Sequence, residues 1–210
     1  MPTTSLTGRS AVKRQSILAA GQQLFLEHGY TGTSMDHVAA TASVSKQTVY
    51  KHFGEKRELL YAIVTDALDR TAAAIGHRIA ALPDSIDLDN DLAELAGDYL
   101  RAVLQEPVVQ LRRLVIGEAN RLPELARLYY EHAPLRTLGS LADAFSRLHG
   151  RGLLNAPEPS LAAEHFAFLI VGRPIDQALF DGASTVLAAL DVDSYARSGV
   201  EVFLAAYRSR

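Results

Sequence analysis

The chain has 210 residues, of which 48% are hydrophobic and 21% charged, a composition typical of a folded globular protein and not of a disordered one. It has no cysteine, which excludes disulfides, thiolate metal ligands and a cysteine nucleophile. The formal net charge is -3, and every apolar run is shorter than the roughly 18 residues of a membrane span. We therefore expect a cytoplasmic protein without a membrane-crossing segment or a secretory signal.

Positive charge is concentrated in the N-terminal third of the chain. Residues 1–60 hold seven Lys and Arg but only four Asp and Glu, and all four lysines lie before residue 58. A basic region on an otherwise acidic chain favours a local anionic partner such as nucleic acid. An excess of this size also arises by chance, so charge alone does not decide the function.

Hydrophobic residues recur at helical spacing along nearly the whole chain, and no segment shows the alternation typical of strands. Glycine, proline and capping residues set the expected helix ends. The first expected helix ends at His28-Gly29, and a capping box of Thr33 and Asp36 opens the second. The long helix after Pro123 should bend at Pro134, and the helix capped by Ser160 contains Pro174. After the first, the expected helices cover about 34–41, 45–52, 55–82, 88–107, 108–118, 123–149, 160–180 and 194–208. We predict an all-α fold with an N-terminal three-helix, helix-turn-helix domain at about 1–54 and a larger helical domain at about 55–210.

The helix-turn-helix is predicted at residues 34–53, with its tight turn at Ala42-Ser43-Val44. Val49 and Phe53 should face the core of the domain. The second helix of such a motif enters the major groove of DNA. The side chains expected on the exposed face of the helix at 45–52 are Lys, Gln, Ser, Thr and Tyr. They suit this role, because Gln pairs with adenine, Lys pairs with guanine, and hydroxyls mostly contact phosphate. The alternative is that the helix pair is merely a corner of a helical bundle.

Residues 12–61 carry a series of spaced motifs: Arg14-x-x-Ile17-Leu18-Ala19-Ala20, Leu24-Phe25-x-x-x-Gly29-Tyr30, Thr33-Ser34-Met35-x-x-Val38-Ala39 and Val44-Ser45-Lys46-x-Thr48-Val49-Tyr50-x-x-Phe53-x-x-Lys56-x-x-Leu59-Leu60. Together they resemble the N-terminal domain of TetR-family transcriptional regulators. Ser43 stands where that family usually has glycine, so we expect it to adopt a positive φ at some cost. Further along, Leu111-Arg112-Arg113-Leu114-Val115-Ile116-x-Glu118-Ala119, Pro123-Glu124-Leu125-Ala126 and Tyr129-Tyr130-Glu131 are similar to the AefR-like C-terminal subgroup.

The resemblance implies a set of DNA-contacting residues. Thr33, Ser34, Tyr50 and Lys56 match positions that contact phosphate, although Thr33 and Ser34 are primarily caps and Lys56 could be a solvated charge. Gln47 and Thr48 would read bases, and Lys46 would contact either a base or a phosphate. The full set of DNA-binding candidates is Thr33, Ser34, Ser45, Lys46, Gln47, Thr48, Tyr50, Lys51 and Lys56.

The resemblance also implies a ligand-binding and dimerisation domain. Its helices at about 161–180 and 194–208 would pair with those of a second subunit in a four-helix bundle. Polar or aromatic residues in apolar stretches are candidates for the ligand pocket, although such residues are more often satisfied core groups; they are Tyr99, Glu118, Tyr129, His132, His165, Phe168 and Arg173. We expect internal ion pairs, not pocket contacts, from Arg112, Arg113, Glu118 and Arg121.

No sequence pattern supports catalysis, a cofactor or a metal. The histidines are scattered without i,i+4 pairing, and neither a phosphate-binding glycine loop nor a G-x-S-x-G motif occurs. We therefore predict a TetR-like repressor, not an enzyme, which a small-molecule effector releases from a palindromic duplex operator. The alternatives are a helical small-molecule-binding protein or enzyme without sequence-specific DNA binding, and a sequence-independent DNA binder.

Overall fold

The computed structural model describes residues 4–209, and within this range the chain is helical, with one isolated bridge between Leu154 and Arg208. Contacts divide the chain into two compact units. The first unit comprises the chain up to Ala67 together with Leu114–Ala126, and the second comprises Leu68–Arg113 and Arg127–Arg210. This division differs from the expected boundary at residue 54, because the start of the fourth helix and a segment from the middle of the chain pack with the helix-turn-helix.

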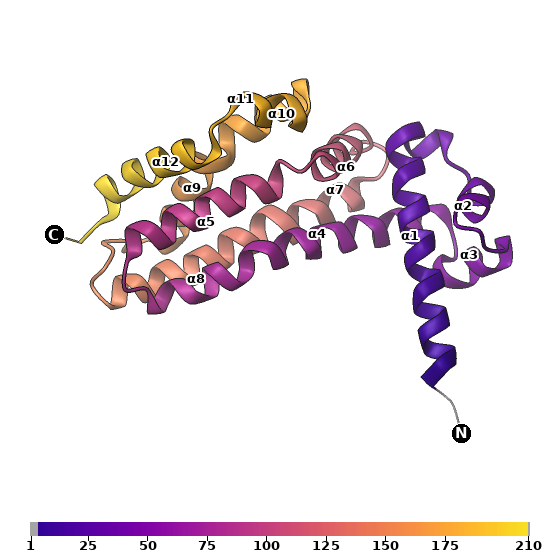
Figure 1. The fold of residues 1–210 in the computed structure, drawn as a ribbon, viewed down its shortest axis with the longest axis horizontal. Helices are drawn as coiled ribbons and strands as arrows, with labels where there is room; N and C mark the ends of the chain where they lie inside the picture. The colour runs from indigo at the N-terminus through magenta and orange to yellow at the C-terminus, as the bar shows by residue number, and fades with distance from the viewer. Residues whose placement is uncertain (1–3, 210) are drawn as a thin grey trace. The chain divides into compact units, whose positions relative to one another are not determined.

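The first unit is built on α1 (Thr4–Gly32), α2 (Met35–Thr41), α3 (Lys46–Phe53) and the first part of α4 (Lys56–Ala81). Figure 1 shows α2 and α3 together beside α1. The last residues of α6 (Glu106–Gly117) and the first of α7 (Pro123–Tyr130) complete this unit. Its core is apolar and includes Ile17, Phe25, Val38, Val49 and Leu59, all fully buried. As predicted, the backbone of α1 leaves helical geometry at Gly29, where φ is 69°.

The second unit contains the rest of α4 and α6 and the helices of the C-terminal half. The further elements are a 3-10 turn η1 (Leu82–Asp84), α5 (Leu88–Val103), a π-helical turn η2 (Glu131–Leu135), α8 (Arg136–Gly150), α9 (Pro159–Ala167), a second π-helical turn η3 (Phe168–Gly172), α10 (Arg173–Asp181), α11 (Ala183–Ala189) and α12 (Val192–Tyr207). In Figure 1, α5 runs alongside α12, and these two helices share an extensive contact.

Three features of the second unit differ from the sequence expectation. The short helix α11 was not predicted, because Gly182 and Leu190 bound a segment of only seven residues. Ser160 does not cap α9: the N-cap position is Glu158, with Pro159 following. The two expected long helices are interrupted by π-helical turns, one containing Pro134 and one ending two residues before Pro174. A proline removes a backbone donor, and a wider turn is one way for the chain to accommodate that loss.

An aromatic cluster forms the centre of the second unit. Phe145, Phe166 and Phe203 are buried, and their ring centroids lie 5.2 to 5.6 Å apart. Phe166 meets both neighbours edge-on, at 83° and 78°, the arrangement that aromatic quadrupoles favour. These rings come from α8, α9 and α12, so the cluster ties the C-terminal helices into one core.

Candidate nucleic-acid interface and ligand cavity

The turn between α2 and α3 closes without glycine. Ala42 remains in helical geometry, whereas Ser43 has φ 55°, as the sequence predicts. The Val44 amide donates to the Ala39 carbonyl at 3.0 Å and the Ser43 amide to the Ala40 carbonyl at 3.1 Å. Positive φ places a serine side chain in a strained region, so the turn is formed at a local energetic cost.

The second helix of the motif, α3, presents a polar face to solvent. Ser45 is its N-cap, and its Oγ accepts a hydrogen bond from the Thr48 amide at 3.2 Å. Val49 and Phe53 are buried, which confirms the predicted orientation of this helix. The exposed side chains of α3 are those of Lys46, Gln47, Tyr50 and Lys51, with Thr48 half-buried. A short helix with donors and acceptors on its free side fits the width of a major groove.

An acidic neighbour holds the first lysine of α3. The Lys46 ammonium donates to the Asp36 carboxylate at 2.5 Å, and both side chains are more than half exposed. Exposed pairs of this kind contribute little to stability. Lys46 is therefore free to exchange Asp36 for a phosphate or a base without a large cost.

Thr33 does not have the position that the sequence suggested. Its side chain is buried, with 2% exposure, and its hydroxyl donates to the carbonyls of Leu24 at 3.0 Å and Gly29 at 2.8 Å. Ser34 is the N-cap of α2, since its Oγ accepts from the His37 amide at 3.2 Å. The prediction of Thr33 as cap is wrong, and its side chain is enclosed where a phosphate cannot reach. Ser34 remains exposed.

Lys56 fixes the end of α1 to the start of α4. Its ammonium donates to the Tyr30 carbonyl at 2.7 Å and the Thr33 carbonyl at 2.9 Å, and lies 4.4 Å from the centre of the Tyr30 ring. Burial lowers the pKa of Lys56, as does the charge of Arg121, while Glu118 raises it. Lys56 is therefore not a solvated charge, since main-chain carbonyls take two of its three donors.

The segment from the middle of the chain meets the same part of the first unit. Arg121 donates to the Thr31 hydroxyl at 2.6 Å, and its guanidinium lies 5.7 Å from the centre of the Tyr30 ring. Tyr30 thus receives two cations, one from α4 and one from the turn between α6 and α7. Sequence reasoning missed this cluster, because its members are up to 90 residues apart.

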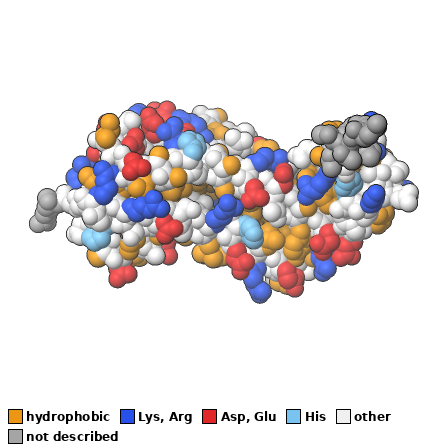
Figure 2. All heavy atoms as spheres, turned by 90° about the horizontal axis from the view of Figure 1, so that it is seen from below, with side chains coloured by type: hydrophobic (Ala, Val, Ile, Leu, Met, Phe, Trp, Pro, Cys, Tyr) orange, Lys and Arg blue, Asp and Glu red, His pale blue; other side chains and the backbone are white. Residues whose placement is uncertain are grey.

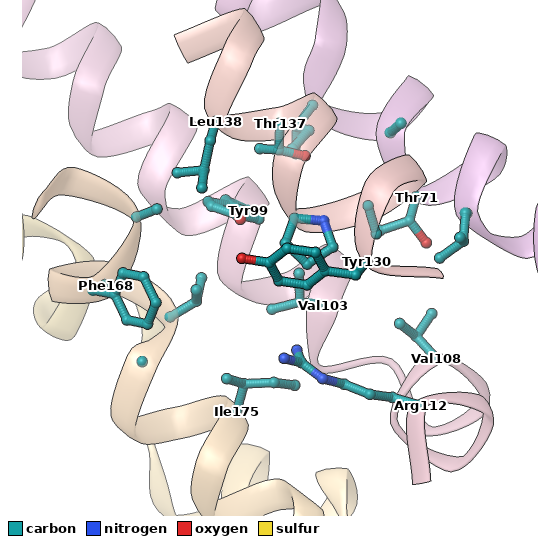
Figure 3. A pocket seen from close by; sticks show the side chains of 18 of the residues that line it. Thr71, Tyr99, Val103, Val108, Arg112, Tyr130, Thr137, Leu138, Phe168 and Ile175 are labelled. Carbon is teal, nitrogen blue, oxygen red and sulfur yellow. The ribbon is translucent and has the colours of Figure 1, made fainter. Parts of the chain in front are cut away.

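A cavity of about 590 Å³ lies within the second unit, a size typical of small-molecule sites. Figure 3 shows apolar and polar side chains pointing into it from several helices. Of the predicted pocket residues, Tyr99, Tyr129, Phe168 and Arg173 line this cavity. Both π-helical turns also contribute to its wall, Pro134 from η2 and Phe168 from η3. π-helical turns occur frequently at functional sites, which agrees with a binding role for this cavity.

The other three predicted pocket residues lie elsewhere. Glu118 belongs to the first unit, near Lys56. The Nδ1 atom of His132 lies 3.0 Å from the Leu128 carbonyl, and Nδ1 of His165 lies 2.6 Å from the Tyr207 hydroxyl. None of the three lines the cavity.

Of the four residues of α6 and the following turn for which ion pairs and no pocket contacts were expected, only Arg112 lines the cavity, and the printed bonds of Arg113 and Arg121 go to uncharged groups. Arg113 donates to the Phe180 carbonyl at 3.3 Å, and Arg121 to Thr31. Arg112 lines the cavity, which the sequence did not indicate. Its arginine neighbour at position 113 made the two look equivalent, whereas the helix directs them to different environments.

Two tyrosines combine deep burial with access to the cavity. Tyr99 and Tyr129 are each 8% exposed. Burial raises the pKa of the Tyr99 hydroxyl to about 12, against a smaller opposing effect of the Arg112 charge. Burial raises the pKa of Tyr129 in the same way. Both hydroxyls are therefore protonated near neutral pH and can donate hydrogen bonds.

Residues 4–209 contain no group of three or more His, Asp or Glu side chains arranged to hold a metal ion. Across the same range, every helix is too short or too polar to cross a bilayer.

A helix-turn-helix with an exposed polar second helix, in a chain that also has a helical unit with a ligand-sized cavity, is typical of a one-component transcriptional regulator. Residues 17–63 match the model of the bacterial regulatory proteins of the tetR family, and residues 90–209 match that of the AefR-like transcriptional repressor C-terminal domain. The chain belongs to the TetR family and is a transcriptional regulator, not an enzyme.

Known relatives support this assignment over most of the chain. A TetR-family regulator from Mesorhizobium loti is 35% identical, with a TM-score of 0.87 covering 95% of this chain and 98% of that one. The flavonoid-responsive regulator FrrA is 28% identical, with a TM-score of 0.73 over 94% of this chain and 98% of its own. The HTH-type regulator YezE of Bacillus subtilis is 24% identical over 70% of this chain and 75% of its own length.

Proposed function

We propose that this protein is a homodimeric repressor that binds a palindromic operator and leaves it when a small organic molecule occupies the cavity. The observation that carries the proposal is the exposed polar face of α3 in a chain that also encloses a cavity of about 590 Å³. The match of residues 90–209 to an AefR-like repressor domain supports repression. The flavonoid response of FrrA supports a small organic effector.

On the operator, α3 would lie in the major groove. Gln47 would pair with adenine, Thr48 would contact a base edge, and Lys46 would contact guanine or a phosphate. Phosphate contacts would come from Ser34, Ser45, Tyr50, Lys51 and the remaining donor of Lys56. Thr33 is withdrawn from this set, because its hydroxyl is used inside the first unit.

The face drawn in Figure 2 carries charges of both signs, which does not favour purely electrostatic binding there. On the face shown in Figure 2, blue and red side chains are interspersed instead of forming one basic field. A sequence-independent binder depends on such a field, because phosphate neutralisation supplies nearly all of its affinity. Base contacts from α3 would therefore have to make the affinity for the operator higher than the affinity for random duplex.

The dimer would form through the C-terminal helices of the second unit. Large apolar side chains are exposed on the helices expected at 161–180 and 194–208; they include Leu161, Phe168, Leu169, Phe180 and Val202. A two-fold pairing of these helices in two copies would bury this surface. It would also present two α3 helices to successive major grooves, about 34–36 Å apart.

Release requires that the ligand favour a state that does not fit the operator. Leu68, Thr71 and Ile75 of α4 line the cavity, while the same helix begins with Lys56 in the first unit. A ligand that displaces α4 would therefore act on the residues that hold the helix-turn-helix. A ligand with equal affinity for both states would change nothing.

Selection of random duplex DNA on the purified full-length protein, followed by binding at two salt concentrations, tests the proposal. We expect a palindromic site bound on the order of a thousandfold more tightly than random duplex, with affinity falling steeply as salt increases. Gln47→Ala should relax the preference at one base pair of each half-site, at about 1–3 kcal/mol. The matched control is Gln23→Ala, which should leave base preference unchanged. Gln23 is an exposed glutamine of α1 that donates to Glu27. Recovery of no enriched site would overturn the operator-binding function.

A further inference from the structure

The cavity contains a cation without a protein counter-ion. Arg112 reaches into it from α6, and Figure 3 shows its guanidinium beside Ile175 and below the ring of Tyr130. Within residues 4–209, no carboxylate lies within ion-pair distance of Arg112, and the side chain makes no hydrogen bond to a described group. Its side chain is half-buried, so its hydration is reduced as well.

An unpaired guanidinium in such a setting is unfavourable for the empty protein. Removing a charge from water costs free energy unless an opposite charge or hydrogen-bond acceptors replace the water. The planar fork of arginine matches a carboxylate, which it can bind through two parallel hydrogen bonds. An anionic ligand group at this point would supply the counter-ion that the chain does not.

Two buried hydroxyls of the cavity wall lie within the electrostatic reach of this charge. The Tyr99 and Tyr129 side chains line the same cavity, and neither hydroxyl bonds to another described residue. No fully enclosed side-chain polar atom in the described chain lacks a hydrogen-bond partner, so neither hydroxyl is sealed inside the core. Each can donate to an anion held by Arg112.

The other charges of the lining do not compete for the same role. Arg173 and Asp176 lie on exposed positions of α10 and carry opposite signs. The rest of the wall is mainly apolar or aromatic and includes Val103, Pro134, Leu138, Phe168 and Ile175. The hydroxyl-bearing side chains of Thr71, Tyr130 and Thr137 also line it. The cavity thus combines one inward cation and several hydroxyls, of which those of Tyr99 and Tyr129 are the buried ones, with a wall suited to rings.

We propose that the cavity binds an organic acid: an apolar, ring-bearing body with a single carboxylate that Arg112 holds, with hydrogen bonds from Tyr99 and Tyr129. The inference deepens the proposed function, on which it rests, by giving the effector a chemical class. A neutral analogue of that acid, with the same shape, should contact the same apolar wall but leave Arg112 without a counter-ion.

The test is calorimetric titration of the full-length protein, without DNA, using naphthoate against naphthamide and cinnamate against cinnamamide. We expect each acid to bind at least about tenfold more tightly than its amide, as a charge-assisted bidentate contact predicts. Arg112→Gln should abolish this preference by weakening the acids while leaving the amides unchanged. Arg112→Lys should retain part of it, because the charge stays but the fork is lost. Arg113→Gln, one residue along α6 and outside the cavity, should behave as the parent protein.

Three results would overturn the inference: equal affinity of acid and amide, equal weakening of both by Arg112→Gln, or no binding of any acid at millimolar concentration. Thermal unfolding of each variant shows whether it is folded before titration. Operator release is measured separately, on the DNA site selected above. If the acids bind through Arg112 but do not release the operator, the ligand class stands and the proposed control of DNA binding fails.

Discussion

The two units of this regulator are stabilised by different kinds of contact. In the first unit, polar side chains bind the backbone at the ends of helices, as with Thr33 and Lys56, which donate to main-chain carbonyls around the end of α1. In the second unit, the rings of Phe145, Phe166 and Phe203 interlock in a buried cluster. Both units bury an apolar core; the first adds directed hydrogen bonds around the end of α1, and the second adds interlocked rings.

This difference matches the task of each unit. Reading DNA requires that α3 be held in one orientation, and hydrogen bonds to fixed backbone atoms specify orientation better than apolar packing in a small core does. Enclosing a ligand requires a cavity that does not collapse. A large aromatic core can tolerate a hollow of about 590 Å³ elsewhere in the same unit, because its own packing is complete.

The largest effect should come from the aromatic cluster. Phe166→Ala should lower the free energy of unfolding by about 3–5 kcal/mol, through lost burial and the cavity left behind. Urea unfolding followed by circular dichroism measures this loss. Ile86→Ala, at a fully exposed apolar residue, is the control and should change stability by less than about 0.5 kcal/mol. A loss at Phe166 below about 1 kcal/mol would mean that the cluster does not organise the second unit.

Lys56 should come next, since it makes charged hydrogen bonds to two carbonyls. Lys56→Met keeps the length of the side chain but removes both bonds, and should cost about 1.5–3 kcal/mol in unfolding free energy measured without DNA. Lys51→Met, at an exposed lysine of α3, should leave stability nearly unchanged. If Lys56→Met left stability intact and only reduced the salt dependence of operator binding, Lys56 would be a phosphate contact and nothing more.

The Thr33 hydroxyl should have a slightly smaller effect. Thr33→Val removes its hydrogen bonds to Leu24 and Gly29 at nearly constant volume and should cost about 1–2 kcal/mol, while Thr33→Ser should keep most of the stability. Neither change should alter the salt dependence of operator binding, because the side chain does not reach DNA. A reduced salt slope for Thr33→Val with unchanged unfolding would restore the original assignment of Thr33 to phosphate.

Features set by neighbouring residues were predictable from the sequence. The positive φ of Ser43, the Ser45 cap and the burial of Val49 and Phe53 all follow from spacing over a few residues, and the structure agrees with each. The break near Pro134 was also predictable, although not its π-helical form. These features depend on local sterics and on the helical period, both of which a single sequence contains.

Features set by distant residues were not predictable. Thr33 and Ser34 are adjacent hydroxyls, and only the position of Leu24 and Gly29 in space decides which one caps α2 and which one is buried. Arg112 and Arg113 are likewise adjacent, and the walls around α6 decide which faces the cavity. A sequence shows residue types in order, but not which surface another segment of the chain will cover.

The smallest predicted effect is that of glycine substitutions in the turn between α2 and α3. We expect them to change the free energy of unfolding in opposite directions at two neighbouring residues. Ser43→Gly should raise the free energy of unfolding by about 0.5–1 kcal/mol, because glycine adopts the φ of 55° without the steric cost that serine bears. Ala42→Gly, at φ -75°, should lower it by a similar amount, because there glycine only adds conformational freedom to the unfolded chain. The two variants share the same turn and the same exposure to denaturant, so their difference isolates backbone strain from any general loosening. Stabilisation by both, or by neither, would show that the turn tolerates serine without strain and that hydrogen bonds alone hold α2 and α3 in place.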